Sequence, residues 1–339
     1  MHPSPAVPGG STGCHDGDVH ASAEDPPTTL PLLISLDENA EGRGYQGLTE
    51  LSVRPGTPVL NEALALSLTA DTGQPSQRYA YATYTINGRT TTRLLLEHPD
   101  EMYANSSFDG DGYLYKADAN SRMEYRGGAD QSKYAGQFTQ INAIDDGNLQ
   151  PIINFLAWLD GANDEEFDAH VSDWVDTTSL ARYLATQNLL ANGDDMGGPG
   201  QNYYLWYDLS TKKISVVSWD LNLAMTGGAA TKPDEDVQMG PPPDAEMPGA
   251  PRRAPNFGNP LKTRFLDSAH GRRPITGGRT GSCMTRCTQT EGRKPCSTTS
   301  HPGSPITDGL DEEQLSAAAR TLGTWITQRM ENLDAARSG

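Results

Sequence analysis

The sequence lacks long apolar runs and any readable targeting segment. None of its 339 residues fall in an uninterrupted apolar run of about 18 or more, so no segment is predicted to span a membrane. The first residues, 1–18, contain neither a basic region nor an apolar core, and therefore show no signal peptide. We expect either a cytoplasmic protein or a start that differs from the natural one.

Positive charge is also scarce. The chain has 26 Lys and Arg against 44 Asp and Glu, which gives a formal net charge of −18. The phosphates of DNA or RNA would be repelled by such a protein, so no nucleic-acid partner is expected. An acidic balance of this kind is weakly typical of secreted or envelope proteins.

Cysteine is rare, and its pattern does not favour a disulfide framework or a metal cluster. Cys14 stands alone, whereas Cys283, Cys287 and Cys296 share one Arg- and Gly-rich stretch with His301 nearby. Structural zinc sites prefer paired ligands about two to four residues apart on both arms, set in a foldable frame. Incidental cysteines are therefore favoured over a zinc site. The seven histidines are scattered and form no Ser-His-Asp set.

Hydrophobic patterning begins near residue 30 and first predicts a β-rich part. The dipeptide Asn87-Gly88 separates two β-rich runs, and Asn-Gly is the strongest short hairpin signal. A short helix is expected to open at Pro99, because proline suits the first helical turn. Strands are expected over 30–36, 48–53, 79–86, 89–97 and 112–117, with helices over 59–68 and 98–104.

A helical block and a second hairpin follow. Asp176 or Thr177 is the expected N-cap of the third helix in this block. The order of elements predicts an α+β fold in which the functional loops follow a helix. Helices are expected over 149–159, 165–175 and 178–191, and strands over 203–207 and 213–218.

Composition divides the chain into four parts. Residues 1–29 indicate a disordered or non-native leader, and 30–267 a single domain that includes a Pro- and Gly-rich loop over 228–254. Residues 268–305 are basic and unpatterned, and 306–339 hold a final helix with Leu315, Leu322, Trp325 and Ile326 on one face. We hypothesise that 268–305 come from a shifted reading frame or a sequencing error; clean reads in an unshifted frame would refute this.

The chemistry-bearing residues are Asp194, Asn202 and Asp220. Each alone is typical of ordinary turns, because Asn and Gly favour left-handed backbone and Asp favours Asx-turns. Their order is more specific: a helix, an acid, an Asn opening a strand, and a partner strand ending in Asp. Kinases need one carboxylate to orient the attacking hydroxyl, and an Asn and an Asp to hold Mg²⁺ at the phosphates.

The spacing excludes an ordinary protein kinase. Asn202 follows Asp194 by 8 residues, Asp220 follows Asn202 by 18, and residues 196–200 widen the first gap. The HRD, DFG and Gly-rich G-x-G-x-x-G motifs of ordinary kinases are absent. A separate motif, 109–112, raises a calcium alternative, but its glycines do not match an EF-hand loop and a tight turn is favoured.

The segment Asn-Gly-Asp194…Asn202-Tyr-Tyr-Leu…Val-Ser-Trp-Asp220-Leu resembles the signature of the CotH-type kinases, atypical bacterial spore-coat protein kinases. The resemblance covers roughly residues 31–265 and the last helix. It implies an atypical protein-kinase-like fold with a metal-site hairpin. Further matches are the hairpin 77–88, the strand end 95–97, the Leu-Tyr-Lys strand 112–117 and the Asn-Pro-Leu element 259–261.

The resemblance also implies roles. Asp194 would be the catalytic aspartate, with Asp220 and Asn202 as metal ligands; Asp195 is the residue most easily confused with Asp194. Lys116 would neutralise nucleotide phosphate and Glu97 would orient it, although Lys116 also suits an exposed strand lysine. The implied cofactors are ATP and Mg²⁺, or Mn²⁺. The implied partners are Ser/Thr-bearing coat or envelope proteins at a spore coat or cell envelope, and no oligomeric state is indicated.

Two departures keep other functions open. The family usually shows Trp-Asp-x-Asp, and here Asn222 takes the last position, which keeps a carbonyl ligand but removes a charge. The family also has a Gly-Asn-Ser-rich segment followed by lysines before its first strands, thought to help form the nucleotide site. No such segment is found before Leu30 in this sequence. One alternative is therefore a catalytically impaired CotH-like structural or assembly protein of the spore coat or cell surface. Another is an Asp-rich, calcium-binding surface module.

Overall fold

The computed structural model describes residues 28–36, 43–55, 59–142, 147–232, 237, 258–271 and 311–338. All four cysteines and His301 lie outside these residues, as do most of the loop 228–254 and residues 272–305 of the basic stretch. The hypotheses on zinc and on a shifted frame therefore concern parts of the chain that are not described. The proposed division into four parts remains a prediction.

The first sheet contains four antiparallel strands in the order β1-β2-β4-β3. Its β3–β4 hairpin turns at Asn87 and Gly88, which both have positive φ (52° and 76°), as a two-residue type I′ turn requires. The predicted hairpin is thus confirmed. The strands are β1 (Leu32–Ser35), β2 (Glu50–Val53), β3 (Tyr79–Ile86) and β4 (Arg89–Glu97).

The second sheet is also antiparallel, in the order β6-β5-β7-β8. The strands β7 and β8 form the predicted second hairpin, with Tyr203 opposite Ser218 at one end and Tyr207 opposite Ile214 near the other. The fifth predicted strand, β5, also has the expected bounds, whereas β6 was not predicted. The strands are β5 (Gly112–Ala117), β6 (Phe138–Gln140), β7 (Tyr203–Asp208) and β8 (Ile214–Ser218).

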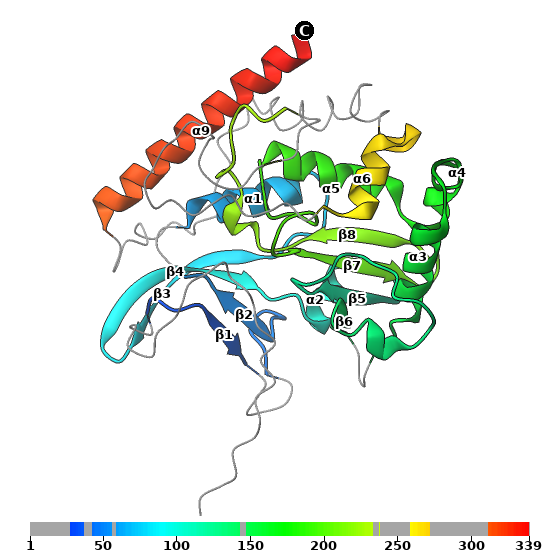
Figure 1. Cartoon of the computed structure of the whole chain (residues 1–339). Coiled ribbons are helices and arrows are strands. Elements are labelled where there is room, and N and C mark those ends of the chain that lie inside the picture. Colours follow the sequence, from blue (N-terminus) through cyan, green and yellow to red (C-terminus); the bar gives the residue numbers. More distant parts are fainter. Residues whose placement is uncertain are drawn as a thin grey trace, which may run out of the picture.

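Helices cover one side of both sheets (Figure 1). The helix α1 (Leu60–Asp71) packs on β4 through a cluster that includes Leu66 and Leu94. The largest core joins the second sheet to α3 (Gln150–Gly161), α4 (Asp164–Trp174), α5 (Thr177–Leu189) and α6 (Pro260–Asp267). The mixed architecture of two antiparallel sheets and helices agrees with the α+β prediction.

Side-chain caps fix where these helices begin. Asp176, one of the two expected N-caps, accepts hydrogen bonds from the backbone N–H groups of Thr178 and Ser179 and starts α5. Asn163 and Glu166 form a capping box at the start of α4. The third helix of the block therefore begins where the sequence predicts.

Several predicted helix boundaries are wrong. The helix expected over 59–68 is α1, which continues to Asp71. The helix expected over 98–104 is α2 (Glu101–Ser107), because the backbone N–H of His98 still bonds the Glu50 carbonyl of the first sheet and Asp100 provides the cap. Pro99 therefore lies before the helix. The helix expected over 178–191 ends at Leu189, and Ala191 turns with φ 44°.

The long C-terminal helix, α9 (Glu312–Ser338), joins the cluster formed by α1. Leu322 and Trp325 pack against that cluster, on the face that the sequence predicts. Arg329, which is 2% exposed, donates to backbone carbonyls that include those of Asn188 and Ala229. Within the described residues, none of the helices combines the length and the apolar character needed to cross a lipid bilayer.

Candidate functional site

Asp194 lies in the loop between α5 and β7, directly after the predicted turn. The Asn192 side chain accepts the backbone N–H of Asp194 at 3.2 Å, so this segment does contain an Asx-turn. The Asp194 carboxylate is nevertheless engaged from both sides. Its Oδ1 accepts the backbone N–H of Gly200 at 2.6 Å, and its Oδ2 accepts the Asn202 side-chain amide at 2.9 Å.

The widened loop 196–200 wraps closely around Asp194. A Cβ on Gly198 would lie 2.4 Å from the Asp194 Cα, and a Cβ on Gly200 would lie 2.5 Å from the Asp194 Oδ2. Only glycine allows such an approach. The insertion that separates this chain from ordinary kinases therefore forms the cover of the carboxylate, and Asp194 is 7% exposed.

The β7–β8 hairpin brings Asn202 and Asp220 to the same place. Asn202 precedes β7 and Asp220 follows the end of β8, at the end of the hairpin where Tyr203 pairs with Ser218. The Asn202 Nδ2 lies 2.9 Å from the Asp194 Oδ2 and 3.4 Å from the Asp220 Oδ2. One buried amide therefore links the two carboxylates.

The backbone around this cluster is unusual. The described residues include eight non-glycine residues with positive φ, and four of them lie within five residues in sequence of Asp194, Asn202 or Asp220. Such conformations cost free energy and gather at functional sites, where the surrounding structure holds them in place. These four residues are Ala191, Gln201, Asp220 and Met225.

Lys116 lies on the neighbouring strand, where its ammonium donates to the Ala117 carbonyl at 2.6 Å. On β5 it pairs with Tyr204 of β7, and its ammonium lies 5.4 Å from the centre of the Tyr204 ring. The residue is half-buried rather than exposed. Its positive charge lowers the pKa of Asp194 and of His98, so it lies within Coulombic range of both groups.

Glu97 is buried, but its partner is Arg78. The Arg78 guanidinium binds both carboxylate oxygens, at 3.1 Å and 2.8 Å, and the Arg78 backbone N–H adds a third hydrogen bond. In the described structure, Glu97 thus binds Arg78 rather than Lys116. Its predicted role in orienting Lys116 stays a prediction.

Asp195, the neighbour of Asp194, has a separate set of partners. Its Oδ2 lies 2.8 Å from the Lys262 ammonium of α6, and its Oδ1 accepts the backbone N–H of Gly197. Asn259, which caps α6, donates to the Met196 carbonyl. These contacts tie the loop to α6, so Asp195 anchors the cover of Asp194.

Two linked ion pairs next to Asp220, formed by Arg54 with Glu62 and with Asp220 itself, were not predicted from the sequence. Arg54, just after β2, donates to the Glu62 carboxylate of α1 at 2.6 and 2.8 Å, and its guanidinium lies 2.7 Å from the Asp220 Oδ1. Arg54 is 4% exposed and Glu62 is fully buried. The available signal was a glutamate four residues before Leu66, on the face of α1 that enters the core.

Electrostatics distinguish Asp194 from an ordinary aspartate. Burial raises its pKa and the Asp195 carboxylate raises it further, while the Gly200 N–H and the Lys116 ammonium lower it; the net shift is upward. Burial also lowers the pKa of His98, which Arg54 and Lys116 lower further against the opposing charge of Asp100.

The donor set suits a hard cation held by oxygen. Among the described residues, no group of three or more His, Cys, Asp or Glu side chains could hold a metal ion, so amide oxygens would have to complete the Asp220 carboxylate. Asn222, two residues after Asp220, has such an oxygen: its Oδ1 is buried with no hydrogen-bond partner in the described structure. Mg²⁺ and Ca²⁺ prefer carboxylate and carbonyl oxygens. The residues present therefore fit a divalent cation.

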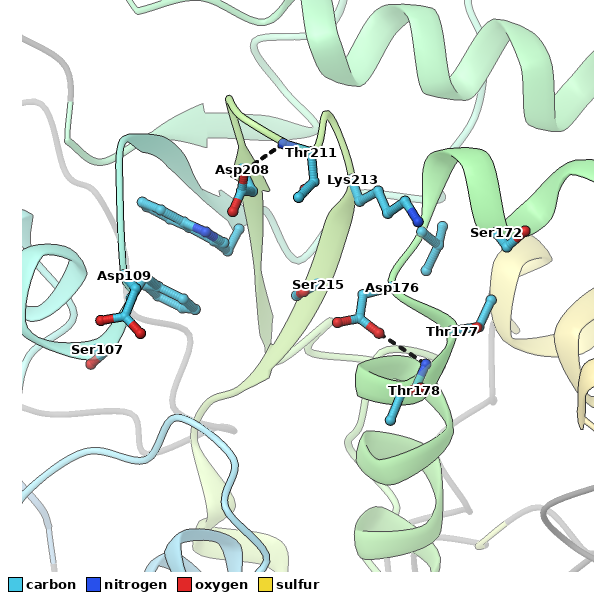
Figure 2. A pocket seen from close by; sticks show the side chains of 13 residues that line it. Ser107, Asp109, Ser172, Asp176, Thr177, Thr178, Asp208, Thr211, Lys213 and Ser215 are labelled. Carbon is cyan, nitrogen blue, oxygen red and sulfur yellow. Dashed lines mark hydrogen bonds between the residues drawn. The ribbon is translucent and has the colours of Figure 1, made fainter.

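A different cavity lies at the opposite end of the β7–β8 hairpin (Figure 2). It has a volume of about 510 Å³ and contains none of the residues predicted for catalysis. Asp176 and Asp208 line it together with Lys213 and several hydroxyl side chains. Phe108 and Trp206, whose rings stack 4.2 Å apart, also line it.

Comparison with known proteins identifies the family. The family model described as CotH kinase protein matches residues 56–270, more than half of the chain, so the chain belongs to this family. The match contains Asp194, Asn202, Asp220 and Lys116. A search of curated proteins finds no match.

Proposed function

We propose that this member of the CotH kinase family is an atypical Ser/Thr protein kinase that transfers the γ-phosphoryl group of ATP to hydroxyls of coat or envelope proteins. The observation that carries the proposal is the Asn202 amide, which lies within 3.4 Å of both the Asp194 and the Asp220 carboxylates. The acid proposed to orient the hydroxyl thus lies beside the two side chains proposed to hold the metal, which is the arrangement that phosphoryl transfer requires.

In this proposal, Asp194 orients the attacking hydroxyl and accepts its proton. Burial supports this role, because the raised pKa makes the carboxylate a better base than a solvated aspartate. The Gly200 N–H and the Asn202 amide fix the direction of its two oxygens. The bound Mg-ATP would supply the phosphoryl group and neutralise its developing charge.

Asp220 would hold the metal through its carboxylate, and Asn202 and Asn222 through their side-chain carbonyl oxygens, while the Asn202 amide nitrogen binds the carboxylates. The buried and unpaired Asn222 Oδ1 supports its inclusion, because a buried amide oxygen costs free energy until a partner satisfies it. Lys116 would bind phosphate on the other side of the cluster. Mn²⁺ would replace Mg²⁺ in the same oxygen set.

Autophosphorylation with labelled ATP tests the metal assignment. We expect Asp220→Ala to lose phosphoryl transfer while the circular dichroism spectrum keeps its folded shape. Retained autophosphorylation in that variant would refute the assignment of Asp220 as a metal ligand.

A second candidate is a structural protein with an impaired nucleotide site. Two observations favour it: Asn222 replaces an acid, and the loop 196–200 leaves Asp194 only 7% exposed. Nucleotide binding separates the candidates. If Mg-ATP produces neither a thermal shift nor labelled protein, the structural function is supported instead of the kinase.

A further inference from the structure

The two oxygens of the Asp220 carboxylate face different partners. The Arg54 guanidinium lies 2.7 Å from Oδ1, and the Asn202 amide lies 3.4 Å from Oδ2. The side of Asp220 that faces Arg54 is therefore opposite the side that faces Asn202 and, through it, Asp194.

Arg54 is itself held in place. Its Nε and one terminal nitrogen bind the two oxygens of Glu62 at 2.8 and 2.6 Å, in a bidentate pair that fixes the guanidinium plane. The same guanidinium lies 5.3 Å from the centre of the ring of Trp219, the residue before Asp220. The terminal nitrogen that binds Glu62 is also the one that lies 2.7 Å from the Asp220 Oδ1, so the pair with Glu62 fixes the place of the positive charge beside Asp220.

The first turn of α1 also holds the segment that follows Asp220. The Asn61 side chain donates to the backbone carbonyls of Asn222 and Ala224, at 2.5 and 2.9 Å. Asn61 and Glu62 are adjacent in α1, so one helical turn anchors both the backbone of this segment and the arginine that orients its acid.

We propose that Arg54, fixed by Glu62, is a positioning residue that turns the Asp220 carboxylate so that Oδ2 faces Asn202 and Asp194. This inference rests on the proposed function, because it concerns the carboxylate proposed to bind metal. Partners that orient metal ligands typically change metal affinity by about 10- to 100-fold when they are removed.

The sharpest test is Arg54→Lys, which keeps the charge and removes the planar fork. A lysine cannot form the bidentate pair with Glu62 and still present a fixed edge to Asp220. We expect Mn²⁺ affinity, measured by electron paramagnetic resonance of free and bound Mn²⁺, to fall by about 10-fold. Unchanged affinity in a folded variant would overturn the proposal, because charge alone would then suffice.

Arg54→Met gives a second, independent outcome. Removing a cation makes the cluster more negative, so simple electrostatics predict tighter Mn²⁺ binding. Positioning predicts weaker binding, because the Asp220 carboxylate loses its orientation. Tighter binding would therefore overturn the proposal.

A matched control separates positioning from general damage. Arg329→Met removes another buried arginine, whose hydrogen bonds include those to the carbonyls of Asn188 and Ala229. We expect it to lower the melting temperature with Mn²⁺ affinity within about twofold of wild type. An equal loss of Mn²⁺ affinity in both variants would overturn the specific role of Arg54.

The two levels of the proposal fail differently. The metal site of the proposed function fails if the wild-type protein does not bind Mn²⁺, or if Asp220→Asn binds it as tightly as wild type. The inference on Arg54 then fails as well. If wild type binds Mn²⁺ through Asp220 and Arg54→Lys binds equally well, only the inference on Arg54 fails.

Discussion

The two ends of the β7–β8 hairpin place the same residue type in opposite environments. Asp208, at the turn, is only partly buried, and hydrogen bonds from the Ser210 hydroxyl and the Thr211 backbone lower its pKa. Asp194, at the other end, is buried, and burial raises its pKa. The pKa of Asp208 is thus set by its neighbours in sequence, whereas that of Asp194 depends on how deeply the folded loop buries it.

The largest expected difference is in phosphoryl transfer. Asp194→Asn keeps the size of the side chain but removes the base, and we expect the kinase turnover to fall by about 10²- to 10⁴-fold. Asp208→Asn, at the far end of the same hairpin, should leave turnover unchanged. Initial rates of ³²P transfer measure both; equal losses would mean that the two ends do not differ in function.

Burial at the end of the hairpin near Asp220 should also have the larger effect on the free energy of unfolding. Glu62→Ala leaves Arg54 buried without its bidentate partner, and breaking a buried ion pair typically costs about 3–5 kcal/mol. The matched exposed pair is His170–Asp173, near the cavity end, with side chains 58% and 67% exposed. Asp173→Asn should cost less than about 1 kcal/mol. Urea unfolding measures both, and similar costs would contradict the contrast.

Substitutions in the glycine-containing loop 196–200, which covers Asp194, should lower stability by a smaller amount. Gly200→Ala forces a Cβ to within 2.5 Å of the Asp194 Oδ2, so we expect a loss of about 1–3 kcal/mol together with reduced turnover. Gly136→Ala is the control, because its Cβ would meet nothing within 4 Å. A normal melting temperature and turnover in Gly200→Ala would show that the loop yields easily.

The smallest expected effect is on how the free energy of unfolding changes with pH, which should have opposite signs for Asp194 and Asp208. A carboxylate with a raised folded pKa binds its proton more tightly in the folded state, so Asp194 loses stabilising effect as pH rises from its unfolded pKa through its folded pKa. Asp194→Asn should therefore become more stable relative to wild type as pH rises through that window.

Asp208 has the opposite sign. Its folded pKa is lowered, so its contribution is present above the unfolded pKa and disappears as pH falls through the folded pKa. Asp208→Asn should therefore lose stability relative to wild type as pH rises through its own window. Chemical denaturation at a series of pH values measures both variants. The same slope in both would remove the electrostatic contrast between the two ends.

Apart from β6, the strands were predictable because their signals are local, and the order of Asp194, Asn202 and Asp220 along a helix and a hairpin indicated that they meet. Asn87-Gly88 defines one hairpin, and the polar turn between β7 and β8 defines the other, which brings the ends of those strands together. The ion pairs of Arg54 with Glu62 and Asp220 were not predictable, since they depend on how α1 packs against the first sheet. The closeness of Gly198 and Gly200 to Asp194 likewise requires the folded loop; the sequence shows only an insertion.

Transfer of ³²P from labelled ATP to the protein itself, in Mg²⁺ and in Mn²⁺, tests the central claim most directly. The claim predicts labelled Ser or Thr in the wild-type chain with at least one of the two metals, and none in Asp194→Ala. Equal labelling of the two proteins, or no labelling of folded wild type in either metal, would contradict it.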